Sequence, residues 1–140
     1  MNFPRINQLS VSTKPLVGGL VLVAAVAQAG SPELDGKAFD VEMLPAGADE
    51  PVDNTLTFHD GTFLSAVCVN HDFPQSSYTA HESDGEVRFE VRAESYTKGY
   101  MTWEGTVENG QLEASAVWHR PDRDEPVRFE ISGTEKSKAR

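Results

Sequence analysis

The dipeptide Asn109-Gly110 lies between two runs in which apolar and polar residues alternate. Asn-Gly is strongly favoured in the two-residue turn of a β-hairpin, because both turn positions require a positive φ. A two-residue turn also fixes the register of the strands that it joins. The hairpin from Gly99 to Arg120 is therefore the feature that most constrains the fold.

In this register, large side chains face small ones across the hairpin. One face carries the pairs Met101–Trp118, Trp103–Ala116, Gly105–Ala114 and Val107–Leu112. The other face is mostly polar and carries the pairs Tyr100–His119, Thr102–Val117, Glu104–Ser115 and Thr106–Glu113. Large residues opposite small ones are typical of the interior of a small closed barrel, so we expect the apolar face to point inward.

Two further tight turns, Asp60-Gly61 and Asp84-Gly85, join other alternating runs. They pair Phe58 with Phe63, Leu56 with Ser65, Ala80 with Phe89 and Tyr78 with Val91. The third strand is expected over residues 62–69. In total, eight short strands predict an all-β fold, an eight-stranded antiparallel up-and-down barrel, with a two-sheet sandwich as the alternative.

Successive connections of such a meander alternate between the two ends of the barrel. The three tight turns therefore share one end. The longer loops share the other end and cover residues 44–54, 70–75, 95–98 and 121–124. Ligand sites in barrels of this kind are expected at the loop end.

The N-terminal 29 residues predict a signal peptide that is cleaved on export. Two basic residues, Arg5 and Lys14, precede an apolar run that ends in Ala27-Gln28-Ala29. An uncleaved membrane anchor is the alternative. We therefore expect a single barrel domain over residues 30–133, a flexible tail over 134–140, and a periplasmic or extracellular location.

Removal of residues 1–29 would leave ten basic and 22 acidic residues, a net charge of −12. This acidity argues against nucleic acid and against an anionic membrane surface as partners. It favours solubility, or a cationic partner. We expect no association with a membrane after cleavage.

The layout of eight meandering strands in about 110 exported residues resembles that of the calycins, which include lipocalins and streptavidin. The Leu56-to-Ser65 hairpin, Cys68 and the Trp103-Glu104-Gly105 hairpin also resemble small uncharacterised exported bacterial proteins. That second resemblance implies no activity. Small periplasmic barrels also include inhibitors of lysozymes and proteases.

The predicted interior is lined by large side chains, among them Tyr78, Met101, Trp103 and Trp118, with four phenylalanines. This set predicts a filled core and not a large cavity. A shallow ligand site at the loop end remains open. Its expected residues are Tyr78, Tyr96, Tyr100, Trp118, His119 and Arg120, because aromatic surface with a few polar groups is the usual composition of a small-molecule site.

Cys68 is the sole cysteine, so the chain forms no internal disulfide. A buried apolar role, a reactive thiol and an intermolecular disulfide are all open for it. Cys68 and His71 are weak candidates for metal ligands, because no second pair of ligands lies nearby. His119 is the other histidine expected near this thiol.

The sequence contains no catalytic motif of the G-x-S-x-G, Walker or H-E-x-x-H type. We therefore expect a protein that is not an enzyme, has no cofactor, and binds a small apolar or amphipathic ligand at the loop end. A protein-binding module, such as an inhibitor of a cationic hydrolase, is the second hypothesis. A thiol or metal protein that uses Cys68 is the third.

The exported chain is predicted to begin at or within a few residues of Gly30, because the Ala-x-Ala exit places cleavage after Ala29. Intact-mass measurement and N-terminal sequencing of the exported protein test this. An exported chain that still begins with Met1 would contradict it.

Overall fold

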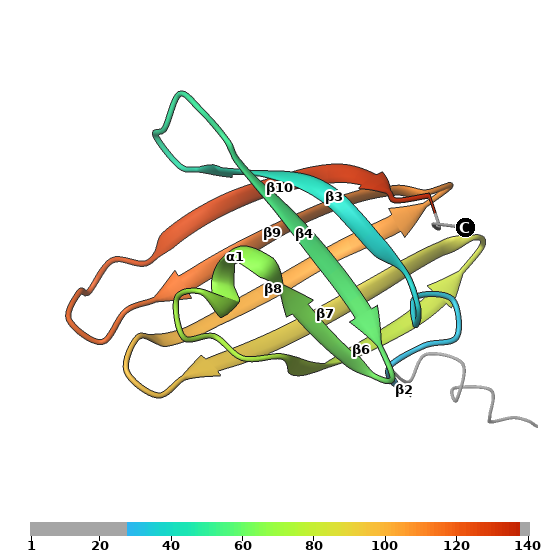
Figure 1. Ribbon diagram of the computed structural model, residues 1–140, viewed down its shortest axis with the longest axis horizontal. Coiled ribbons are helices and arrows are strands. Elements are labelled where there is room, and N and C mark those ends of the chain that lie inside the picture. The colour runs from blue at the N-terminus through green and yellow to red at the C-terminus, as the bar shows by residue number, and fades with distance from the viewer. Residues whose placement is uncertain (1–27, 138–140) are drawn as a thin grey trace, which may run out of the picture.

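The computed structural model describes residues 28–137 (Figure 1). Its strands are β2 (Gln28–Ala29), β3 (Ala38–Pro45), β4 (Val52–His59), β5 (Thr62–Ser65), β6 (Ser76–Ser83), β7 (Glu86–Ser95), β8 (Gly99–Glu108), β9 (Gln111–His119) and β10 (Val127–Glu135); the helix α1 spans Ala66–Val69. Most of the predicted signal peptide, residues 1–27, and the end of the predicted tail, residues 138–140, lie outside the described residues.

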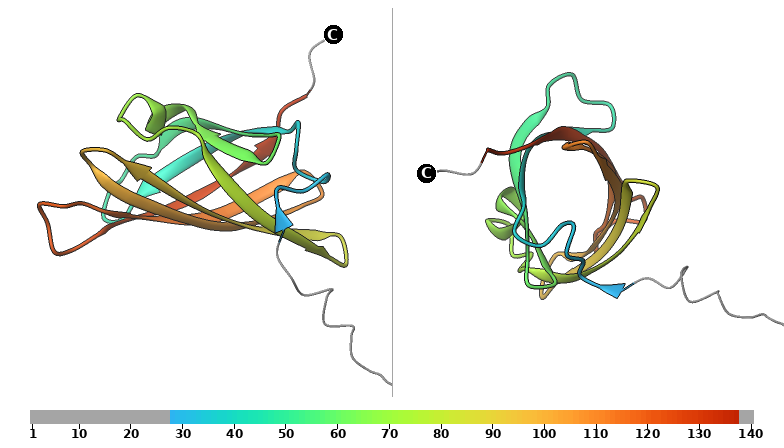
Figure 2. Two further views of the ribbon diagram at one scale, coloured as in Figure 1. Left: turned by 90° about the horizontal axis from the view of Figure 1, so that it is seen from below. Right: turned by 90° about the vertical axis from the view of Figure 1, so that its right-hand side faces the viewer.

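Strands β3 to β10 form a closed antiparallel barrel in which each strand pairs with its neighbours in the sequence. The last strand, β10, also pairs with β3 and so closes the ring (Figure 2). The fold is the eight-stranded meander barrel that the sequence predicts, and not the two-sheet sandwich. The short strand β2 lies outside the ring and pairs with β6.

The tight turns have the registers that their sequences predict. Asn109 and Gly110 have φ values of 54° and 76°, so both turn residues are left-handed, as a type I′ turn requires. All eight predicted cross-strand pairs of the central hairpin are present. The predicted pairs of the hairpins at Asp60-Gly61 and Asp84-Gly85 are present as well.

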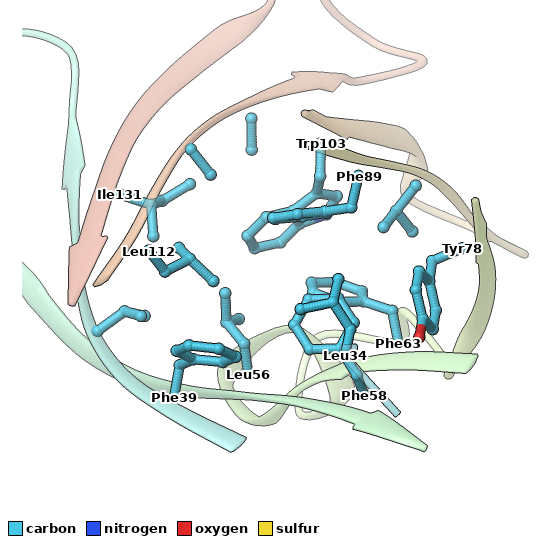
Figure 3. Close-up of a cluster of buried hydrophobic side chains, with 14 of the residues drawn as sticks. Leu34, Phe39, Leu56, Phe58, Phe63, Tyr78, Phe89, Trp103, Leu112 and Ile131 are labelled. Carbon is cyan, nitrogen blue, oxygen red and sulfur yellow. The ribbon is translucent and has the colours of Figure 1, made fainter. Parts of the chain in front are cut away.

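Aromatic rings meet across the interior of the barrel (Figure 3). The ring centroid of Phe58 lies 4.9 Å from that of Tyr78 and 5.1 Å from that of Phe89. The ring centroids of Phe63 and Trp103 are 4.9 Å apart. Phe58 on β4 and Phe89 on β7 come from strands that do not pair, so their side chains fill the space between opposite walls.

The third strand is shorter than the predicted span of 62–69, because β5 ends at Ser65 and α1 follows. The hydroxyl of Ser65 caps this helix and accepts a hydrogen bond from the Cys68 backbone N–H at 3.3 Å. Asn54 on β4 donates its side-chain amide to the same hydroxyl at 2.8 Å. The strand therefore ends at a polar contact with β4, which alternation along the sequence does not reveal.

The last strand extends two residues into the segment that was predicted as a tail from residue 134. Thr134 and Glu135 belong to β10, which pairs with both β3 and β9. The Glu135 N–H donates to the Gly110 carbonyl at 2.9 Å, and the Lys136 N–H donates to the Ala38 carbonyl at 2.8 Å. Two neighbouring strands thus hold this polar segment in the sheet.

Residues 30–37, which we call the N-terminal strap, lie at the tight-turn end of the barrel. Leu34 in this strap is fully buried. The Gly36 N–H donates to the Phe58 carbonyl at 2.7 Å, and the Phe58 N–H donates to the Lys37 carbonyl at 2.9 Å. At the loop end, the buried Phe73 joins the core. Apolar side chains from connecting segments therefore extend the core toward both ends.

Trp103 should be a major contributor to stability, because its side chain is 2% exposed and packs on Phe63. We predict that Trp103→Ala lowers the free energy of unfolding by about 3–5 kcal/mol, as is typical for a buried aromatic residue. Tyr96→Ala is the control, because Tyr96 is fully exposed, and should change it by less than about 0.5 kcal/mol. Equal denaturant midpoints for the two variants would contradict this packing.

Candidate functional site

Two of the residues expected at the loop end, Tyr100 and His119, come together at the rim where β8 and β9 meet. The rings of Tyr100 and His119 stack at a centroid distance of 4.5 Å with an interplanar angle of 17°. On the outer face of β7, the Arg92 guanidinium lies 3.8 Å from the centre of the Tyr100 ring. Glu94 accepts a hydrogen bond from Arg92 at 2.8 Å, and this bond raises the pKa of Arg92.

Trp118 precedes His119 on β9 and points to the opposite face, where it packs against the edge of the core. Its indole N–H donates to the Lys98 carbonyl at 2.7 Å, and its ring meets Phe73 edge-on at 6.2 Å. The Arg120 guanidinium lies 5.2 Å from the Trp118 ring centre. Trp118 and Arg120 therefore pack against each other, with Trp118 partly buried between its neighbours.

Tyr96 projects fully into solvent and borders a shallow groove of about 580 Å³ at the loop end. The apolar residues of this groove are Val69, Pro74 and Tyr96. Asp72 and Glu94 supply carboxylates at its edge. The groove thus combines apolar surface with negative charge.

The structure corrects the placement of Tyr78, which was expected to contribute to the loop end. β6 is shifted along β5, so that Ser77 pairs with Thr62, next to the Asp60-Gly61 turn. Tyr78 faces the interior, as the alternation predicts, and is 1% exposed. Because of this shift it lies by the N-terminal strap and presents no surface to a ligand at the loop end.

The hydroxyl of Tyr78 joins the strap to the barrel wall. It donates to the Asp35 carboxylate at 2.7 Å and accepts from the Ser31 backbone N–H at 3.0 Å. Asp35 also accepts from the Gly61 N–H at 3.0 Å. The bond from Gly61, followed by that from Tyr78, lowers the pKa of Asp35, whereas burial, followed by the bond to Asp35, raises the pKa of Tyr78.

Cys68 lies in α1 with its thiol directed into the core. Its sulfur is 3.7 Å from the sulfur of Met101. Burial raises the pKa of the thiol, so the nucleophilic thiolate is disfavoured. His71 is exposed on the following loop, and its backbone N–H donates to the Cys68 carbonyl. Within residues 28–137, no group of three His, Cys, Asp or Glu side chains is placed to hold a metal ion.

The outer face of the barrel carries a feature that the sequence analysis did not identify. Five exposed glutamates lie on five adjacent strands, from β7 through β8, β9 and β10 to β3. These residues, which we call the acidic band, are Glu90, Glu104, Glu113, Glu130 and Glu42. They line a groove of about 730 Å³ that also contains Arg88 and His81.

The register of the closed sheet brings the acidic band together in two rows. One row runs through Glu90, Glu104, Ser115 and Glu130, which pair in that order across the strands. The second row runs through Glu113, Ser132 and Glu42. At about 4.8 Å between neighbouring strands, the band spans about 20 Å around the barrel.

Two members of the band, Glu90 and Glu104, are directly opposite each other on β7 and β8. Like charges in this position destabilise a sheet. None of the five glutamates forms an ion pair with another described residue, and Arg88 instead pairs with Glu86 at 3.3 Å. The five carboxylates of the band therefore have no salt-bridge partner within 4.0 Å among the described residues.

A signal for the band was present in the sequence, because the predicted hairpin registers already placed Glu104 and Glu113 on the outer face. The neighbours Glu130 and Glu42 could not be added, since Glu130 is placed by the pairing of β10 with β9 across a longer connection, and Glu42 by closure of the barrel between β10 and β3. Alternation along a strand predicts which face a residue lies on, but the pairing of strands joined by longer connections decides which residues become neighbours on that face.

Comparison with protein-family profiles, with curated protein sequences and with solved structures finds no match to this chain. The chain forms a closed eight-stranded antiparallel barrel, and no match supports its assignment to the calycins. No helix among residues 28–137 is long and apolar enough to cross a membrane.

The contacts of Tyr78 with the strap generate a testable expectation. Tyr78→Phe should lower the free energy of unfolding by about 1–3 kcal/mol at neutral pH, because the Ser31 N–H loses a buried partner. The pKa of Asp35 is lowered in the folded state, so ionised Asp35 stabilises the fold at pH values above the ordinary pKa of an aspartate. This stabilisation is lost as the pH falls through the lowered pKa. The deficit of the variant should therefore be smaller at about pH 2 than at pH 7.

Urea titrations of wild type and Tyr78→Phe at both pH values measure this difference. Tyr96→Phe is the matched control, because its hydroxyl is exposed and the same atom is removed. An equal loss of unfolding free energy at both pH values would contradict this expectation, because it would show that the Tyr78 hydroxyl stabilises the fold independently of the ionisation of Asp35.

Proposed function

We propose that this protein is an exported binding module, without catalytic activity, that docks a positively charged surface of a partner protein on its acidic band. The observation that carries the proposal is the opposed pair Glu90 and Glu104, neither of which forms a salt bridge with a described residue. Such a pair lowers the stability of the free protein, and a cation from a partner would relieve that cost. Departures from local stability rules are expected at functional sites.

The filled interior supports an outer binding surface. Rings from β4 and β7 meet at 5.1 Å inside the barrel, where a lipocalin-like ligand would have to lie. The connection 46–51 also supports docking of a protein, because it is exposed, contains Asp49 and Glu50, and projects from the barrel (Figure 2). Pro51 of this connection lines the same groove as the acidic band.

A small amphipathic ligand at the loop end is the second candidate function. The observation that favours it is the groove of about 580 Å³ beside Tyr96, with its apolar floor and its two carboxylates. A ligand with an apolar body and a cationic head would match both properties. The buried thiol of Cys68, with its raised pKa, makes the third hypothesis, a reactive thiol, the least supported.

The acidic band can be tested by neutralising one of its two opposed carboxylates. We predict that Glu104→Gln raises the free energy of unfolding by about 0.2–1 kcal/mol, because it removes a like-charge pair. The same variant should retain less of the basic proteins of the host's exported fraction when it is immobilised at low ionic strength. Electrostatic docking also predicts that retention by the wild type falls as salt is added.

Glu125→Gln is the matched control, because it removes one exposed glutamate outside the acidic band and keeps the same net charge as Glu104→Gln. It should leave both stability and retention unchanged. If the two variants lose retention equally, overall charge and not the band attracts the partner. If Glu104→Gln binds as the wild type does, the proposal is wrong.

A further inference from the structure

Strand β6 is longer than its neighbour β5, so part of one edge of β6 has no pairing with β5. β5 has four residues and pairs with β6 only through Thr62–Ser77 and Phe63–Ser76. β6 continues to Ser83. Beyond the Asp60-Gly61 turn, the barrel therefore has a local opening on this side of β6, although β7 covers its other side.

The backbone groups at this opening follow from the alternation of the strand. The Tyr78 N–H donates to Gly61 and the Tyr78 carbonyl accepts from Gly30, so both groups of Tyr78 point away from β7. In an antiparallel sheet, every second residue points its backbone groups to the same side. Ala80 and Glu82 therefore present their N–H and carbonyl groups to the same open edge.

In the described chain, β2 occupies part of this edge. Gln28 pairs with Ala80 and Ala29 pairs with Thr79, both antiparallel (Figure 1). The edge is thus able to accept an added strand. The predicted cleavage after Ala29 would remove β2 and leave the backbone groups of Ala80 without that partner, while β2 does not reach Glu82.

We propose that the exported chain uses this open edge of β6 to bind an extended, basic segment of a partner protein by β-strand addition, in the position that β2 holds before cleavage. This inference rests on the proposed function, since it assigns the partner's point of entry to the strand that adjoins the acidic band. Backbone hydrogen bonds would supply affinity, and side chains on alternate residues would supply specificity.

Charge selects a basic segment over a second copy of this chain. The edge is flanked by exposed carboxylates, those of Asp35, Asp60, Glu82 and Asp84. Its outward face leads through Thr79 to Glu90, which pairs with it on β7 and belongs to the acidic band. Two chains with net charges of −12 would repel each other here, whereas a lysine-bearing strand would be attracted.

The test uses the exported protein, with its N-terminus verified by mass, and a decapeptide of alternating lysine and threonine as the probe. Glu82→Pro removes the N–H that points to the open edge, and leaves the residues that point to β7 unchanged. Glu82→Ala is the matched control, since both changes remove the same carboxylate. We expect the dissociation constant of the peptide to rise at least tenfold in Glu82→Pro relative to Glu82→Ala.

A second measurement needs no protein variant. The same decapeptide, N-methylated on every residue, keeps its charges but has no backbone N–H donor on either edge, and it should bind wild type at least tenfold more weakly. Equal binding of the two peptides would overturn strand addition, even if Glu82→Pro failed to fold. An exported chain that keeps residues 28–29 would also overturn the inference, because β2 would still cover the edge.

The edge and the acidic band can fail separately. If Glu104→Gln weakens retention of basic proteins while N-methylation has no effect on the peptide, the proposed function stands and strand addition at β6 is wrong. If N-methylation weakens the peptide while Glu104→Gln changes nothing, the edge binds strands but the acidic band is not the docking surface.

Discussion

The contact between Phe58 and Phe89 across the interior is the interaction on which the rest of this structure depends. Their strands, β4 and β7, lie on different sides of the ring, and the rings meet at 5.1 Å. Tyr78 and Phe63 add edge-on or tilted contacts to the same ring of Phe58. A barrel filled in this way is stabilised by burial of aromatic surface, and its exposed outer face is left as the place where a partner can bind.

Connecting segments continue this core toward both ends of the barrel. Leu34 of the N-terminal strap is buried at the tight-turn end, and Phe73 is buried at the loop end. Tyr78 links the core to the strap, since its ring packs on Phe58 and its hydroxyl donates a hydrogen bond to Asp35 of the strap. The acidic band lies on the outer face of the barrel, and its first strand, β7, adjoins the opening at β6.

Local signals in the sequence predicted most of the barrel, because three short turns fix the registers of three hairpins. Three features were beyond those signals. The shift of β6 along β5, which moves Tyr78 away from the loop end, depends on a contact between strands joined by a longer connection. The acidic band depends on the pairing of β10 with β9 across a longer connection and on closure between β10 and β3. The burial of Leu34 is not signalled by any periodic pattern in the strap. The stacked Tyr100 and His119 were found because they belong to one hairpin.

The central claim is that side chains fill the interior, which is why the proposed binding surface lies on the outer face of the barrel. Trp118→Phe leaves Trp103 as a single tryptophan inside the barrel, and its fluorescence can be titrated with a brominated fatty acid. We predict only weak, non-saturable quenching, because the space around Trp103 is occupied by neighbours such as Phe63. Saturable quenching with one molecule bound per chain would show an accessible interior and contradict this account.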